Sequence, residues 1–145
     1  MDETLHQFFI ADQADRQEPI NWEKVNQNDS QRRKQVQKMI DDNLLIDSED
    51  FYHAAMVFQH GENSDDYKNA NELAKKSMDM GYEPAKWLFA ASFDRYLLSI
   101  GKHQKFGTQF RFDENGKKLY FPIDPKTTDG ERRKYNVPIK KRVTK

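Results

Sequence analysis

Two helical segments that are apolar around most of their circumference constrain the fold more than any other feature of the sequence. The first is FYHAAMVFQH at 51–60, and the second is AKWLFAASFDRYLLSI at 85–100. A helix that is hydrophobic on nearly every side has to be buried, so both segments belong at the centre of the protein. The sequence therefore predicts a mainly helical domain built around them.

The ends of the other helices are predicted from capping residues and spacing. Residues 1–17 carry an apolar stripe that becomes polar, and Pro19 ends that helix. A polar connector at 18–28 leads to a second helix that begins near Asp29 or Ser30, because both are good N-cap residues. Three more helices are expected between Asp47 and Gly61, Ser64 and Gly81, and Pro84 and Gly101.

After the last of these helices the apolar period changes from about 3.6 to two. Phe106, Thr108, Phe110 and Phe112 alternate as in a strand, and Asp113–Gly116 is a turn sequence. The returning strand is KKLYFPI at 117–123, and one short helix around GERRKY follows. The prediction is a mainly α, compact five-helix bundle with a C-terminal β-hairpin. It forms a single domain, 1–145, divided into a helical part at 1–101, a hairpin at 102–124 and a basic tail at 125–145.

Composition excludes several classes of function. The chain has 24 basic and 24 acidic residues and a net charge of zero, which argues against a general nucleic-acid binder. It has no cysteine, so disulfides and thiolate zinc sites are excluded. The N-terminus does not read as a signal peptide, and no apolar run approaches the roughly 18 residues of a membrane helix. A cytoplasmic protein without a membrane partner is expected.

Several polar residues lie on helix faces that should be buried. Asp94 and Arg95 interrupt the most apolar helix, and Gln59 and His60 close the other central one. A buried charge costs several kcal/mol unless it is paired, so such residues need an explanation. We expect the following residues to converge on one pocket: Asp12, Arg16, Gln59, His60, Asp94, Arg95, Gln104, Thr108 and Gln109.

The chemistry of this set suggests a role for each member. Histidine is the side chain suited to proton transfer near neutral pH, so His60 is the predicted acid or base, with Asp12 or Asp94 orienting the ring or acting as the base. These three are the predicted catalytic residues. Arginine side chains bind phosphate and carboxylate with two hydrogen bonds. The predicted ligand-binding residues are Arg16, Gln59, Arg95, Gln104, Thr108 and Gln109.

No metal or cofactor is predicted. His53 and His60 are two helical turns apart and, with Asp94, match the residue types of a two-histidine, one-carboxylate metal site. Arg16 and Arg95 would repel a cation there, so this interpretation is disfavoured. Motifs for nucleotide phosphates and for acyl-enzyme chemistry are absent from the sequence.

A purely structural interpretation exists for each polar residue. Asp94 with Arg95 is typical of a buried ion pair that fixes two helices, and His60 is typical of a C-cap side chain. A buried glutamine such as Gln59 commonly binds a backbone carbonyl. The number of these residues in so small a domain favours a functional pocket, because a large buried polar network is costly to satisfy.

Two resemblances add to this picture. The order DQ-x-x-R, QH, DR and Q-x-x-GTQ is similar to a family of small bacterial proteins described only as a domain of unknown function, and it implies that these polar positions act together. The phrase ANELAKKSMDMGYEPAKWLFA resembles one Sel1 or tetratricopeptide helix pair, with small residues that let helices approach closely. Those residues are Ala70, Ala74, Ala85 and Ala91. Repeat arrays need about three units, so one unit implies local helix packing.

Three functions remain open at this point. The favoured one is a hydrolase or a binder of a small anionic ligand that carries phosphate or carboxylate. The alternative is a helical-repeat-like protein–protein interaction module, with Tyr67, Tyr82 and Trp87 as anchors. The least favoured is nucleic-acid binding by the basic tail and the hairpin aromatics.

Overall fold

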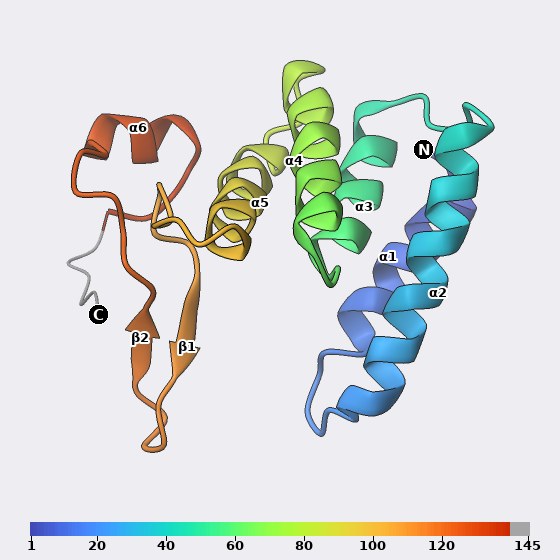
Figure 1. Ribbon diagram of the computed structural model, residues 1–145. Helices are drawn as coiled ribbons and strands as arrows, with labels where there is room; N and C mark the ends of the chain where they lie inside the picture. Colours follow the sequence, from blue (N-terminus) through green and yellow to red (C-terminus); the bar gives the residue numbers. More distant parts are fainter. Residues whose placement is uncertain (140–145) are drawn as a thin grey trace.

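The computed structural model describes residues 1–139 and shows helices that lead into a short hairpin (Figure 1). The two strands of the hairpin are antiparallel, with Phe110 opposite Tyr120. The predicted mainly helical architecture with a C-terminal hairpin is confirmed. The elements of this part of the chain are α1 (Glu3–Ala14), α2 (Trp22–Asp41), α3 (Ser48–Gln59), α4 (Ser64–Asp79), α5 (Ala85–Ser99), β1 (Phe110–Phe112), β2 (Lys118–Tyr120) and α6 (Asp129–Lys134).

The helices lie side by side, with α3 and α4 in the middle (Figure 1). α3 packs along α4, α4 packs along α5, and α1 packs against α3. α1 and α2 form one end of the molecule, and the hairpin with α6 forms the other. No helix in residues 1–139 has both the length and the apolar character needed to cross a bilayer. Residues 140–145 of the predicted basic tail lie outside the described residues.

Local sequence explains where most helices begin. Asp47 is the N-cap of α3, and its side chain accepts the N–H of Asp50 at 3.0 Å. The Asp50 side chain accepts the N–H of Asp47 in return, so the two residues form a capping box. α4 begins at Ser64 and α5 follows Pro84, so these three predicted starts are confirmed.

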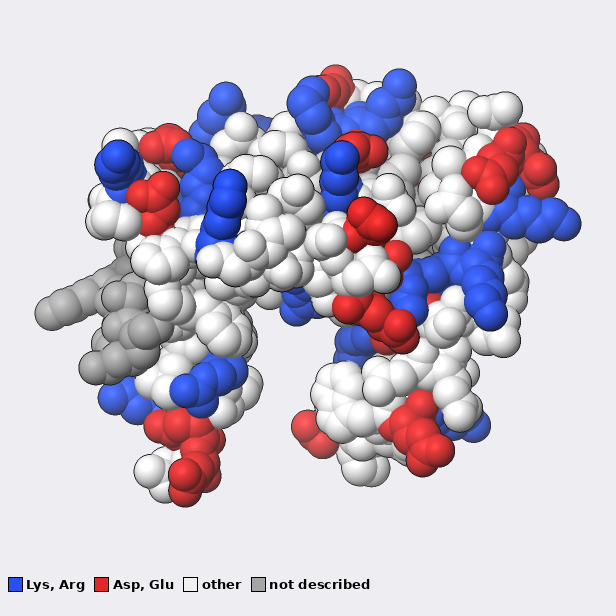
Figure 2. Space-filling model, viewed as in Figure 1, with Lys and Arg blue, Asp and Glu red and all other residues white. Residues whose placement is uncertain are grey.

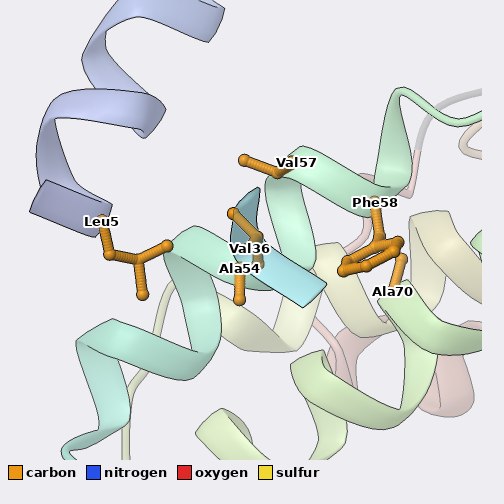
Figure 3. Packing of buried hydrophobic residues seen from close by; sticks show 6 residues of the cluster. All are labelled: Leu5, Val36, Ala54, Val57, Phe58 and Ala70. Carbon is orange, nitrogen blue, oxygen red and sulfur yellow. The ribbon is translucent and has the colours of Figure 1, made fainter. Parts of the chain in front are cut away.

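The core joins four helices through small and medium-sized side chains. Figure 3 shows one cluster of fully buried residues, contributed by α1, α2, α3 and α4. Alanines have no exposed surface at seven positions, which lets the backbones of neighbouring helices approach closely. These positions are Ala54, Ala55, Ala70, Ala74, Ala85, Ala90 and Ala91. The central position predicted for the segment at 51–60 is confirmed, because α3 contacts α1, α2, α4 and α5.

The predicted start of the second helix is wrong. α2 begins at Trp22, because the side chain of Asn21 caps it by accepting the N–H of Lys24 at 3.2 Å. Asp29 therefore lies in the interior of the helix, and its carboxylate binds arginine side chains instead of capping backbone N–H groups.

The first predicted strand is only half formed. β1 contains Phe110 and Phe112, but residues 106–109 form a buried loop. Phe106 is only 2% exposed and packs with Ala90 and Val137 in a separate core cluster. The N–H groups of this loop bind the side chain of Asp94, so they are not available to a strand ladder.

Candidate functional site

An aspartate–histidine pair lies where α3 ends. His60 is the C-cap residue of α3, and its Nδ1 lies 2.7 Å from Oδ1 of Asp12 in α1. The carboxylate of Asp12 is 1% exposed, and its second oxygen accepts a hydrogen bond from Gln13 at 2.7 Å. Because Asp12 holds Nδ1, the other ring nitrogen of His60 is the one presented to a ligand. The two residues therefore have the geometry of an oriented acid–base pair.

The same aspartate belongs to a larger ionic network between α1 and α2. Arg16 donates to Oδ1 of Asp12 at 3.2 Å and grips both oxygens of Asp29, at 3.1 and 2.6 Å. Arg32 bridges Asp29 and Asp15, at 2.8 and 2.9 Å. This network of three carboxylates and two guanidiniums fixes the position of Asp12 beneath His60.

Electrostatics in this network favour the charged forms of Asp29 and Arg32. Burial on its own would raise the pKa of Asp29, but hydrogen bonds from Arg16 and Arg32 outweigh it and hold that pKa below its usual value. Burial would lower the pKa of Arg32, but hydrogen bonds to Asp29 and Asp15 raise it. Asp29 and Arg32 are therefore held as paired ions.

Three side chains of the network are close enough to hold a metal ion. One ligand atom each of Asp12, Asp29 and His60 lies within 4.8 Å of the others. The guanidinium of Arg16, however, contacts the carboxylates of both Asp12 and Asp29. A metal ion would have to displace this guanidinium, so we assign the carboxylates to Arg16.

Arg95 of α5 is the cation of the site that has only neutral partners. Its Nη1 donates to the carbonyl of Gln59 at 2.7 Å, and its Nε donates to Oε1 of Gln109 at 3.2 Å. The guanidinium carbon also lies 5.7 Å from the ring centre of Tyr67. Within residues 1–139, Arg95 forms no ion pair, because no carboxylate oxygen lies within 4.0 Å of its guanidinium nitrogens.

The environment of Arg95 disfavours its own charge. Burial lowers the pKa of Arg95, and the charge of Arg16 lowers it further, while Tyr67 acts in the opposite direction. Arg16 and Arg95 are thus near enough to repel each other. The C-terminus of α3 offsets part of this charge, because helix carbonyls carry partial negative charge. Arg95 shares this helix terminus with Arg33, which donates to the carbonyl of His60 at 2.9 Å.

Gln59 adds an unused acceptor to the site. Its side chain is 5% exposed, and Oε1 is buried without a hydrogen-bond partner among the described residues. A buried unsatisfied oxygen costs about 1–3 kcal/mol, so it is usually explained by a water molecule, an ion or a function. The backbone carbonyl of the same residue, Gln59, accepts the hydrogen bond from Arg95.

The predicted residues of the loop between α5 and β1 have two different roles, since some hold the loop in shape and one contacts Arg95. Gln104 is fully buried; its side chain donates to the carbonyls of Gln109 and Phe121 and accepts the N–H of Gln109. Thr108 accepts a hydrogen bond from Nε2 of Gln109 at 3.0 Å. Gln104 and Thr108 therefore shape the loop, and Gln109 is the side chain that reaches Arg95.

Asp94 faces this loop and not His60. Its buried carboxylate accepts the N–H groups of Lys105 and Phe106 at 2.8 Å, and the N–H and hydroxyl of Thr108 at 3.0 and 2.7 Å. Burial raises the pKa of Asp94, against the effect of these hydrogen bonds. The structure thus places Asp94 as a positioning residue for the loop that carries Gln109. Asp12, not Asp94, orients the imidazole of His60.

Of the predicted set, Asp12, Arg16 and His60 meet directly, and Arg95, Gln59 and Gln109 meet beside them. Figure 2 shows that the molecule is hollowed between the hairpin and the end formed by α1 and α2, with both basic and acidic side chains along the upper edge of the hollow. The sequence interpretation missed three residues of the network, Asp15, Asp29 and Arg32, and also Arg33, which donates to the carbonyl of His60.

The predicted anchors of an interaction surface are mostly covered. Tyr67 is half-buried and donates to the carbonyl of Gly61 at 3.1 Å. Tyr82 is half-buried against Tyr52, with ring centres 5.1 Å apart. Trp87 is 41% exposed and is the member of this trio that presents a ring to solvent.

Comparison of the chain with protein-family models, with curated proteins and with solved structures finds no match. The resemblances to a small bacterial family and to a Sel1-like helix pair therefore stay predictions. The function has to be inferred from the geometry of the site.

Proposed function

We propose that the protein binds a small ligand with a phosphate or carboxylate group beside Arg95, and that His60 exchanges a proton with this ligand. The observation that supports the proposal most is the half-buried guanidinium of Arg95, which has only neutral partners within residues 1–139. An anion would supply the charge that this guanidinium lacks. Arginine suits such a role because its planar fork matches both phosphate and carboxylate.

Nearby groups would add specificity to this anion site. Arg16 contributes a second positive charge, although it is already paired with Asp12 and Asp29. The unpartnered Oε1 of Gln59 is an acceptor, so it would favour a ligand that also carries a hydroxyl or another donor. Gln109 accepts a hydrogen bond from Nε of Arg95, and this contact fixes the orientation of the guanidinium.

The pairing of Asp12 with His60 supports proton transfer in addition to binding. A carboxylate on Nδ1 stabilises the charged imidazolium and fixes the ring, as in other oriented histidine bases. In a hydrolytic reaction, the free ring nitrogen would accept a proton from the attacking water molecule. The guanidinium of Arg95 would stabilise the negative charge on the ligand.

Calorimetric titration with inorganic phosphate and with acetate tests the binding step. We expect wild type to bind one of them at a single site, and Arg95→Gln to weaken that affinity roughly tenfold to a hundredfold, as expected for a lost charged hydrogen bond. Arg111→Gln is the matched control, because Arg111 is exposed on the hairpin. Equal affinity in wild type and Arg95→Gln, or no binding of either anion, would contradict the proposal.

A protein-interaction module is the second candidate, and it is supported by exposed aromatic side chains. Trp87, Phe110 and Phe112 are 41%, 38% and 61% exposed, and large exposed rings are common anchors of interfaces. This candidate predicts that Trp87→Ala abolishes biological activity in the cell and that Arg95→Gln does not. The anion-site proposal predicts the reverse.

A further inference from the structure

A second concave site lies on the other side of α5 from Arg95. Phe93 and Arg95 are two positions apart, and therefore about 200° apart around the helix. On the side of Phe93, a cavity of about 330 Å³ lies between α4, α5, α6 and the loop after α5. This volume is at the lower end of the range for small-molecule pockets, about 300–1,000 Å³.

Aromatic rings form the floor of this cavity. Phe89 of α5 stacks on Tyr135, with ring centres 5.0 Å apart and planes inclined by 27°. Phe106 meets the same tyrosine edge-on at 5.2 Å, and Phe93 lies 6.3 Å from Phe106. A floor of rings that are already fixed against one another offers a flat aromatic group an apolar surface at little entropic cost.

Lysine side chains form the rim. Lys105 is paired with Glu131 at 3.0 Å, and Lys75 is paired with Asp79 at 2.6 Å. Lys134 lies 5.4 Å from the ring centre of Tyr135 and forms no ion pair within residues 1–139. In Figure 2, basic side chains stand on both sides of the region between α4 and α6, with acidic ones among them.

The positive rim extends into a neighbouring cavity. That cavity, about 420 Å³ in volume, shares Phe93 and Lys105 with the first and is also lined by Lys102 and His103. Asp124 is the carboxylate on its wall. The two cavities together place an aromatic floor next to a predominantly basic border.

We propose that this is a second ligand site, which binds a planar aromatic ring that carries a negatively charged substituent. The ring stacks on the floor formed by Phe89, Phe93 and Tyr135, and the substituent pairs with the ammonium group of Lys134. The proposal is independent of the site at Arg95, because the two sites lie on opposite faces of α5 and share no residue.

Two probes distinguish the chemical forms that the negative group can take. Adenosine monophosphate and benzoate each have a planar ring and an anionic group, and adenosine and benzamide are their neutral counterparts. Binding is followed by amide chemical shifts in two-dimensional NMR spectra of the full chain. We expect at least one charged probe to bind saturably and to shift the signals of Phe89, Phe93 and Tyr135, and its neutral counterpart to bind several-fold more weakly.

Single substitutions locate the binding site. Lys134→Gln should weaken the affinity for the charged probe by roughly twofold to fivefold, as expected for one exposed ion pair. Lys68→Gln, an exposed lysine of α4 outside both cavities, is the matched control. The affinity is read only from the signals of Phe89, Phe93 and Tyr135, because the anionic group of either probe would also bind beside Arg95. Both lysine variants alter exposed side chains, so they should fold as wild type does.

Each result decides for or against the site. Binding of adenosine monophosphate alone assigns a phosphate-bearing ring, and binding of benzoate alone assigns a carboxylate-bearing ring. Equal binding of charged and neutral probes, or equal weakening by Lys134→Gln and Lys68→Gln, would overturn the proposal. The absence of saturable binding by both charged probes would also overturn it.

Discussion

Asp94→Asn should destabilise the protein by about 3 kcal/mol, because the buried carboxylate organises a whole loop. The amide keeps the acceptor for the N–H groups of Lys105 and Phe106, but these bonds lose their charge assistance, at about 1 kcal/mol each. The N–H of Thr108 then faces an NH₂ group and stays unsatisfied, at about 1–3 kcal/mol. Removal of a buried charge returns part of this cost.

Urea unfolding at neutral pH measures this difference, and a loss of about 3 kcal/mol is a large part of the 5–15 kcal/mol that stabilises a typical domain. Asp79→Asn is the matched control, because the ion pair of Asp79 with Lys75 is exposed and should contribute less than about 1 kcal/mol. A change within about 0.5 kcal/mol for Asp94→Asn would refute the reasoning. Phosphate binding should also weaken, because Gln109 loses its fixed position beside Arg95.

Two further predictions concern the response to acid. Burial, aided by the charge of His6, lowers the pKa of His53, so stability should fall as the pH drops below about 6.5, and His53→Phe should flatten this part of the urea profile. Arg16 and Arg32 hold the pKa of Asp29 low despite burial, so its contribution is present above about pH 4 and is lost on further acidification. Asp29→Asn should cost about 3 kcal/mol at neutral pH and remove that acid-dependent loss.

Helix starts were predictable from the sequence where a cap precedes an apolar run. Asp47 caps α3, Asn63 caps α4 directly before the predicted Ser64, and Pro84 precedes α5 without a side-chain cap, so all three helices begin where they were expected. These signals act within one turn of helix, so they do not depend on the rest of the fold.

The start of α2 was not predictable in this way, because its buried stripe is half charged. Val25, Asp29, Arg32 and Val36 follow at steps of four, three and four, and all are buried. A search for apolar periodicity overlooks such a stripe, and Asp29 then resembles an N-cap. The spacing with charged residues included would have indicated the longer helix.

The loop before β1 and the site were predictable only in part. The alternation that begins at Phe106 suggested a longer strand, but Asp94 binds the backbone N–H groups of Lys105, Phe106 and Thr108 and prevents one there. The polar pattern indicated that His60 and Arg95 have buried partners. It did not indicate that Asp12 reaches His60, because that contact depends on how α1 packs against α3.

The most direct test of the anion site is a phosphate titration observed at two side chains at once. NMR signals of the His60 ring and of the Arg95 guanidinium should shift together and give one dissociation constant, because a single anion would contact the guanidinium and the neighbouring acid–base pair. Arg95→Gln should remove the shift of His60. Unchanged His60 and Arg95 signals at saturating phosphate, or two unrelated dissociation constants, would contradict the proposed site.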